Sequence, residues 1–116
     1  MNPRYRLRTA ADIARVRAQG TQCRNAHLVL YADAGAAPES RLALIVSSKL
    51  GVAVRRNKIR RRLREAFRPR LPRLQPPVDL VVIARGRTRG ASLVTLSAAV
   101  GEILDQCLAR RSPVVA

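Results

Sequence analysis

Short apolar runs and wider helical spacings alternate along the chain. Residues 27–32 (HLVLYA), 41–47 (RLALIVS) and 78–84 (VDLVVIA) are rich in Val, Leu and Ile, which predicts three strands. The run over 41–47 is nearly continuous, which is typical of a strand covered on both faces. Residues 33–40 (DAGAAPES) have the composition of a loop between the first two strands.

Two helices are predicted toward the ends of the chain. Thr9 and Asp12 are similar to a capping box, with Asp in place of the usual Glu, and they predict a short helix that ends at Gly20. A longer helix is expected to begin near Ser92, because apolar residues keep a helical period over the next four turns. Gly101 lies in its middle, where glycine costs up to about 1 kcal/mol relative to alanine, and the sequence offers no reason for it.

A third helix, expected over about residues 55–68, has two chemically different sides. Its apolar stripe consists of Ile59, Leu63, Ala66 and Phe67. The opposite side consists of Asn57, Arg60, Arg61, Arg64 and Arg68, with Lys58 and Glu65 beside it. Near the border lie Arg55, Arg56 and Arg62, whose long stems can cover the core while their charges reach water. We expect the helix to end before Pro69, because the residue preceding a proline disfavours helical geometry.

The predicted elements run helix, strand, strand, helix, strand, helix. This order predicts one α/β (α+β) domain over residues 1–116, built as a two-layer sandwich. Residues 1–8 form a basic arm and residues 110–116 a tail, and both are expected to be flexible. Residues 69–77 (PRLPRLQPP) contain too much proline for a regular element, and Gly51 is expected to mark a turn.

The charge of the chain indicates a polyanionic partner. Twenty-three Lys and Arg residues against seven Asp and Glu residues give a net charge of +16, which favours binding to nucleic acid. All of these cations except Lys49 and Lys58 are Arg, whose planar fork bonds phosphate bidentately. Aromatic residues make up only 3% of the chain, which argues against a single-strand binder built on stacked aromatics.

Other candidate chemistry is sparse. Cys23 and Cys107 match no metal spacing and are interpreted as free thiols in a reducing cytoplasm. No run of about 18 apolar residues exists to span a membrane, and no secretory signal is recognised, so we expect a cytoplasmic protein. Glu102 and Asp105 are better interpreted as solvent-facing acids than as Mg²⁺ ligands, and His27 stands alone, so neither a catalytic group nor a metal ligand is predicted.

The charged side of the 55–68 helix carries the functional prediction. Arginines four residues apart, such as Arg60 and Arg64, repel each other by roughly a few tenths of a kcal/mol, and Glu65 offsets this only through Arg61. A merely solvated face would mix signs, so a phosphate-binding surface is the better interpretation. Asn57 either caps the helix or bonds a base or a 2′-hydroxyl, and the sequence leaves both interpretations open.

The stretch AVRRNKIRRRLREAFR, preceded by IVSSKLG, resembles the signature of the bacterial ribonuclease P protein component. The motif is carried by Arg56-Asn57-Lys58, Arg60-Arg61 and Arg64-Glu65. The likeness extends to DIARVRAQG and HLVLY upstream and to VVIAR downstream, so it covers most of the chain. It implies a sandwich with a left-handed βαβ crossover through the Arg-rich helix, an exception to the usual right-handed rule.

The resemblance also implies a function and its partners. The family's protein is the accessory subunit of an endoribonuclease, whose catalytic RNA removes the 5′ leader of precursor tRNA with the help of Mg²⁺. The RNA is expected to hold most of the Mg²⁺. The protein alone is expected to be inactive, to bind the catalytic RNA and precursor tRNA, and to need neither a membrane nor an obligate protein partner.

Two sets of site residues follow from the resemblance. The catalytic RNA is expected to contact Arg56, Asn57, Lys58, Arg60, Arg61 and Arg64. The cleft for the leader is expected to be lined by Ile13, Arg17, Tyr31, Lys49, Ala84 and Arg85. The chain departs from the family at Ile13 and Arg17, where Phe is frequent, and at Ser48, where Lys is frequent. Tyr31 is the aromatic that remains for base stacking, and Arg17 can stack through its guanidinium plane.

Three other classes of protein predict different behaviour. A small ribosomal protein shares the size and charge, but it would not restore leader removal by the catalytic RNA at low Mg²⁺. A DNA-packing protein would bind duplex DNA as tightly as folded RNA at the same salt. An independent nuclease would need clustered acids or a His–Lys pair, and this pattern is missing from the sequence.

Overall fold

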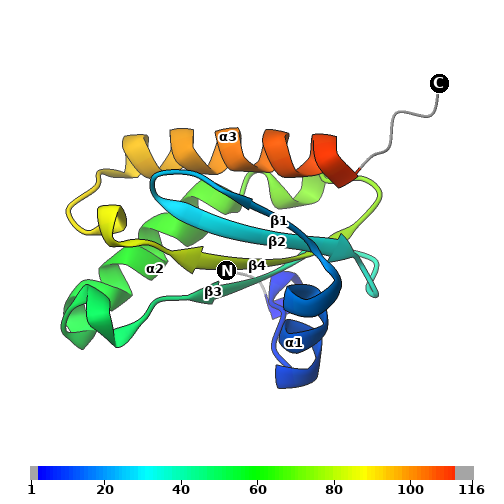
Figure 1. The fold of residues 1–116 in the computed structure, drawn as a ribbon, viewed down its shortest axis with the longest axis horizontal. Coiled ribbons are helices and arrows are strands. Elements are labelled where there is room, and N and C mark those ends of the chain that lie inside the picture. Colours follow the sequence, from blue (N-terminus) through cyan, green and yellow to red (C-terminus); the bar gives the residue numbers. More distant parts are fainter. Residues whose placement is uncertain (1–2, 112–116) are drawn as a thin grey trace.

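A four-stranded mixed sheet with helices on both faces makes up the fold (Figure 1). The computed structural model describes residues 3–111. The helices and strands are α1 (Ala10–Gln19), β1 (Thr21–Arg24), β2 (Leu28–Ala34), β3 (Arg41–Ile45), α2 (Ala53–Phe67), β4 (Val78–Ala84) and α3 (Leu93–Arg111). Short 3₁₀ helices are η1 (Pro3–Tyr5), η2 (Ser48–Leu50), η3 (Leu71–Arg73) and η4 (Gly86–Thr88).

The strand order in the sheet is β1-β2-β4-β3. β2 pairs antiparallel with both β1 and β4, whereas β3 and β4 are parallel. The chain passes from β3 through α2 to β4, its parallel neighbour in the sheet, and this is the βαβ crossover through the Arg-rich helix that the resemblance implied. α2 and α3 form the helical layer on one face, and α1 covers part of the other. The predicted fold class is therefore confirmed.

One strand was not predicted from the sequence. β1 is four residues long, and its sequence TQCR has a single buried apolar residue, Cys23, so it lacks the alternation that marks a strand. Asn25 shapes the turn after it, because its side-chain oxygen accepts hydrogen bonds from the backbone N–H of His27 at 3.0 Å and of Leu28 at 2.9 Å. The order is helix, three strands, helix, strand, helix, which corrects the predicted αββαβα.

β3 is an edge strand and is only partly covered on its two faces, because Leu42 and Ala43 are buried on opposite faces while Leu44 and Ile45 are half-buried. The strand covered on both faces is β4, in which six of seven residues are buried. Along the outer edge of β3, the backbone N–H of Leu7 donates to the carbonyl oxygen of Leu42 at 3.0 Å, and the Leu7 side chain is buried. Residues 3–7 of the arm thus lie against the sheet edge, and the flexibility expected of residues 1–8 stays a prediction.

The last helix extends into the predicted tail. α3 continues through Arg111, so the first two residues of the predicted tail are helical, and residues 1–2 and 112–116 lie outside the described residues. Within residues 3–111, no helix is both long enough and apolar enough to cross a membrane.

Cys23 and Cys107 are buried free thiols, and burial beside Cys23 raises the pKa of the Cys107 thiol to about 12.

Candidate nucleic-acid interface

The packing of α2 decides which of its side chains face outward. The four residues of its predicted apolar stripe are buried in the core that α2 and α3 form with the sheet: Ile59, Leu63, Ala66 and Phe67. Burying this stripe turns the polar side of the helix toward solvent. α2 begins at Ala53, two residues before the predicted start, and it follows Gly51, whose φ of +123° confirms the expected turn.

α2 and the residue that ends it carry eight cations and one acid. The cations are Arg55, Arg56, Lys58, Arg60, Arg61, Arg62, Arg64 and Arg68. The acid, Glu65, has its carboxylate 3.0 Å from the guanidinium of Arg68, not against Arg61 as the spacing predicted. Within residues 3–111 the other seven cations have no carboxylate partner. The positive charge of this helix is thus almost uncompensated.

Asn57 lies inside α2 and does not cap it. The N-cap residue is Val52, which makes no capping bond through its side chain. The side-chain oxygen of Asn57 instead accepts a hydrogen bond from Nη1 of Arg60 at 3.0 Å, and Asn57 is exposed. The capping interpretation is therefore wrong. The amide of Asn57 and the guanidinium of Arg60 are presented together on the outward side of the helix.

Two other arginines of α2 bond to neighbouring backbone. Nε of Arg56 donates to the carbonyl oxygen of Gly51 at 3.2 Å, and Nη1 of Arg62 donates to that of Ala91 at 2.7 Å. Both arginines are half-buried. These bonds hold α2 against the turn before it and against the segment that leads into α3.

A groove of about 200 Å³ lies beside α2 at the edge of β3. Its cations come from two segments far apart in sequence, Arg6 and Arg8 from the N-terminal arm and Arg60 and Arg64 from α2. Burial, together with the charges of Arg6 and Arg60, lowers the pKa of Arg64. Cations that crowd one groove favour an anion there. The arm residues were not predicted because no sequence signal showed that the arm packs beside α2.

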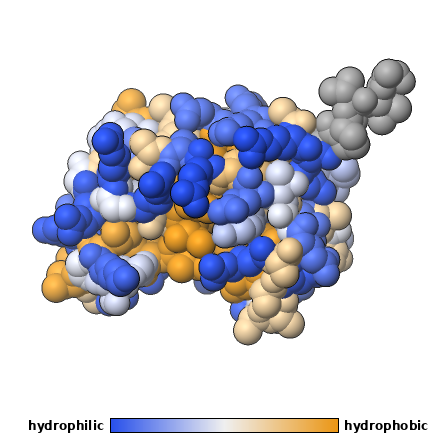
Figure 2. Space-filling view, viewed as in Figure 1, coloured by the Kyte–Doolittle hydropathy of each residue, from blue (hydrophilic) through white to orange (hydrophobic). Residues whose placement is uncertain are grey.

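The sheet face beside α1 has a half-buried apolar floor. Val29, Ile83 and Ile45 are register partners across β2, β4 and β3, and each is partly exposed. Figure 2 shows an apolar area ringed by hydrophilic residues, in the region where Figure 1 draws β3 and β4. At the α1 side of this face, Cζ of Arg17 lies 5.8 Å from the centre of the Tyr31 ring, within the range of a cation–π contact.

Five of the six predicted leader residues lie on this face or at its end. Ile13 and Tyr31 pack on the apolar cluster under α1, and Arg17 covers the Tyr31 ring. Lys49 in η2 and Arg85 are exposed, and they follow the ends of β3 and β4, which lie side by side. The fold therefore gathers three of the residues under α1 and places the two cations at the strand ends.

Ala84 does not line this face. Its side chain is buried in the core under α2 and α3, so its predicted place in the cleft is wrong. Successive side chains of a strand point to opposite faces, and the neighbouring residue Ile83 lies on the α1 face instead. A one-residue error in assigning a strand position reverses the face that is predicted.

The sequence matches a family model described as Ribonuclease P over residues 1–108. The chain belongs to the ribonuclease P protein family. It is 45% identical to the ribonuclease P protein component of Roseiflexus castenholzii over 85 residues, which cover 73% of this chain and 70% of the relative. It is 34% identical to that of Herpetosiphon aurantiacus over 106 residues, which cover 91% of this chain and 86% of the relative.

Solved structures of bacterial RNase P proteins have the same fold. An RNase P protein mutant from Staphylococcus aureus, described as having defective mRNA degradation activity, aligns with a TM-score of 0.82 and 31% identity over 91% of this chain and 88% of that one. The RNase P protein from Thermotoga maritima aligns with a TM-score of 0.77 and 28% identity over 87% and 96%. As a family member, this chain is the protein subunit of the tRNA-processing endoribonuclease and works with the RNase P RNA.

In this ribonuclease P protein, ion pairs attach α1 to the sheet. Nη2 of Arg15 donates to Oδ2 of the buried Asp79 at 2.6 Å, and Nη2 of Arg41 donates to the same oxygen at 2.9 Å. Nη1 of Arg15 also donates to Asp33 at 2.6 Å. Hydrogen bonding to Asp79 raises the pKa of Arg15 and of Arg41. This network was not predicted from the sequence, although an acid inside the apolar run VDLVVIA was a usable signal.

Three of the carboxylates in the described residues lie against arginines. Within residues 3–111, no three His, Cys, Asp or Glu side chains lie where they could hold a metal ion. Asp12, Asp33 and Asp79 lie against the guanidinium groups of Arg15 or Arg41. The oxygens of these three carboxylates, of the kind that a hard cation prefers, are therefore paired with arginine. Within residues 3–111, Glu102 and Asp105 on α3 are exposed and have no arginine within 4.0 Å.

Proposed function

We propose that this ribonuclease P protein binds the catalytic RNA through the outward side of α2 and holds the 5′ leader of precursor tRNA on the α1 face of the sheet. The observation that carries the proposal is the charge of α2, on which seven of eight cations lack a carboxylate partner within residues 3–111. The RNA contacts that we propose are Arg56, Asn57, Lys58, Arg60, Arg61 and Arg64.

The outward side of α2 suits a folded RNA. Phosphates that meet its cations release condensed counterions, which makes binding favourable and dependent on salt. Arg61 is exposed and Arg60 and Arg64 are half-buried, so their guanidinium groups are presented on a rigid helix and not on a loop. Asn57 adds a neutral amide at the same surface, which can bond a 2′-hydroxyl or a base edge.

The α1 face suits a single strand. The apolar floor of Val29, Ile45 and Ile83 is open to flat bases, while Arg17 and Tyr31 offer a guanidinium plane and a ring for stacking. Lys49 and Arg85 are exposed at the end of the same sheet, where they can meet backbone phosphates, and Nη1 of Arg85 also donates to the carbonyl oxygen of Asn25 at 2.5 Å. These features support the leader contacts of Ile13, Arg17, Tyr31, Lys49 and Arg85 and omit Ala84.

The proposal divides the work between protein and RNA. The catalytic RNA supplies the hydrolysis with Mg²⁺, and the protein supplies binding surfaces for two RNA strands that would otherwise repel each other. No catalytic step is assigned to this chain. We expect the protein to act in the cytoplasm, without an obligate protein partner.

The test is reconstitution of leader removal. The full-length protein is mixed with transcribed RNase P RNA and a precursor tRNA at a low Mg²⁺ concentration at which the RNA alone is slow. The proposal predicts that the protein restores cleavage and that the protein without RNA cleaves nothing. A protein that cleaves alone, or that leaves the RNA as slow as before, contradicts the proposal.

A further inference from the structure

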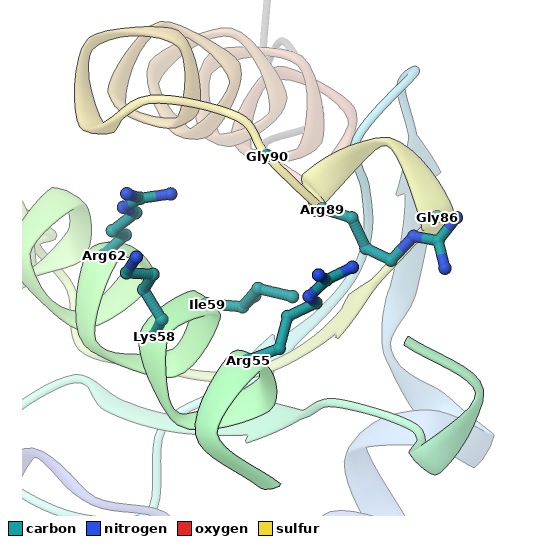
Figure 3. Close-up of a pocket in the computed structure, with 7 residues that line it drawn as sticks. All are labelled: Arg55, Lys58, Ile59, Arg62, Gly86, Arg89 and Gly90. Atoms are coloured by element: carbon teal, nitrogen blue, oxygen red, sulfur yellow. The ribbon is translucent and has the colours of Figure 1, made fainter. Parts of the chain in front are cut away.

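A second positive pocket lies on the other flank of α2, between this helix and the segment that follows β4 (Figure 3). It has a volume of about 500 Å³, which is within the range of small-ligand sites. Arg55, Lys58 and Arg62 line it from α2, and Arg89 lines it from the end of η4, with its guanidinium beside Gly86. The pocket is thus lined by four cations from two segments.

No acid in the described part of the chain balances these charges. None of the four cations has a carboxylate within 4.0 Å among residues 3–111. Cations held around one cavity repel each other unless an anion lies between them. The pocket is also braced, because Arg62 bonds the carbonyl oxygen of Ala91 at 2.7 Å and so ties the two walls together.

Two glycines leave one wall of the pocket without side chains. Gly90 has a φ of +72°, so its backbone conformation favours glycine. Gly86 is different, because its φ is not in that region and a Cβ built on it would meet nothing within 4 Å. The fold therefore does not require glycine at position 86. Without a side chain at this position, this wall of the pocket stays open.

We infer that this pocket binds a phosphodiester of an RNA strand, with Arg55, Lys58 and Arg89 as its contacts and Arg62 as the residue that braces it. The inference rests on the proposed function and extends it. α2 would be held from both flanks, by the pocket on one side and by the groove of Arg60 and Arg64 on the other. Lys58 lines the pocket, whereas its position in the helical period predicted a place beside the outward side of α2.

The first test removes charge from the pocket. Arg55→Ala with Arg89→Ala, both at exposed positions, is compared with Arg73→Ala in η3, an exposed arginine beyond the far end of α2. Affinity for the transcribed RNase P RNA is measured against salt, and affinity of the assembled holoenzyme for precursor tRNA is measured in parallel. These two arms distinguish a phosphate of the catalytic RNA from one of the substrate.

We expect the double variant to weaken one of the two affinities about tenfold or more and to flatten its salt slope by about 0.7–0.9 for each phosphate that is no longer neutralised. Arg73→Ala should leave both slopes unchanged. The inference is overturned if the double variant behaves like Arg73→Ala in both arms. In that case the proposed function still stands if Arg60→Ala with Arg64→Ala weakens RNA binding, so the two failures are distinguishable.

The second test leaves every charge in place. Gly86→Leu adds a side chain at the open wall of the pocket, where the backbone accepts one. If a phosphodiester occupies the pocket, this substitution weakens the same affinity that the charge variant weakens, while the thermal unfolding midpoint shows that the protein is folded. If Gly86→Leu binds both RNAs as the unchanged protein does, the cations act as a diffuse field and the pocket is not a binding site.

Discussion

Nη2 of Arg15 lies 2.6 Å from Oδ2 of Asp79, and the side chain of Asp79 is fully buried. Arg15 belongs to α1 and Asp79 to β4, so this pair joins the helix to the centre of the sheet. α1 buries a single residue, Val16, and this leaves little apolar contact to hold the helix. The ion pair therefore holds α1 in position on the sheet, beside the face that we propose for the leader.

Asp79→Asn tests this attachment. The substitution keeps the shape of the side chain and removes the charge that Arg15 and Arg41 share, while Asp12 and Asp33 stay beside them. We therefore expect the free energy of unfolding to fall by about 1.5–3 kcal/mol, the contribution of a charged hydrogen bond. Urea unfolding measures the loss. Glu65→Gln, which breaks the exposed pair with Arg68, is the matched control and should cost less than about 1 kcal/mol. Equal losses in the two variants would show that the buried pair contributes no more to the free energy of unfolding than the exposed pair does.

Thr9→Ala tests the start of α1. The Thr9 hydroxyl accepts from the backbone N–H of Asp12 at 3.1 Å and donates to its carboxylate at 2.8 Å, which confirms the predicted cap. We expect loss of the cap to cost about 1 kcal/mol, measured by urea unfolding at neutral pH. Thr9→Ser keeps the hydroxyl and should lose much less.

The same substitution should change the response of stability to acid. The hydrogen bond from Thr9, followed by the charge of Arg41, lowers the pKa of Asp12 from its ordinary value of 3.8. A carboxyl with a lowered pKa in the folded state stabilises the fold above pH 3.8 and loses this effect as pH falls through the folded-state pKa. The acid-induced loss of stability below about pH 4 should be shallower in Thr9→Ala than in Thr9→Ser. Identical acid profiles would contradict this assignment.

Gly101 and Arg70 form a second coupled pair. The guanidinium of Arg70 lies against α3 beside Gly101. It donates to the carbonyl oxygen of Ala66 in α2 at 2.6 Å and to that of Ser97 in α3 at 3.2 Å. A Cβ at position 101 would lie 3.2 Å from Nη2 of Arg70. In an Arg70→Ala background we expect Gly101→Ala to stabilise the helix by about 1 kcal/mol, and in the unchanged chain the gain should be smaller or absent. A double-mutant cycle measures this coupling, and equal gains in both backgrounds would refute it.

Tyr31→Ala tests the leader surface. Removing the ring beneath Arg17 should weaken binding of precursor tRNA to the assembled holoenzyme by about fivefold or more, because base stacking on an aromatic contributes about 1–3 kcal/mol. Mature tRNA should bind as before. Tyr31→Phe keeps the ring and is the control that should bind the precursor normally. Equal losses for precursor and mature tRNA would remove Tyr31 from the leader site.

Regular periodic segments were predictable from the sequence, and contacts between distant segments were not. The apolar stripe of α2 and the apolar runs of the three longer strands indicated their own secondary structure, because burial of one face imposes a period on the residues. β1 has four residues and one buried side chain, which is too short for a period to appear. Gly101 had no explanation until the fold brought Arg70 across it.

The same difference between residues of one element and residues of distant segments decides which parts of the candidate site were predictable. The charged side of α2 was visible because its residues share one helix and therefore one period. The pocket was not predictable, because Arg89 and Arg55 line the same cavity only once the segment after β4 has folded beside α2. Ala84 was assigned to the wrong face because strand faces alternate at every residue, and a position taken from a resemblance carries no information about which face it occupies.

The salt dependence of binding to the RNase P RNA tests the central claim most directly. Affinity is measured from low to high salt for the unchanged protein and for Arg60→Ala with Arg64→Ala, which removes two cations from the outward side of α2. If this side binds the RNA, the variant binds more weakly, its log–log salt slope is flatter by about 1.4–1.8, and its thermal stability is level or higher because like charges have been removed. A variant with the slope and affinity of the unchanged protein would contradict the claim.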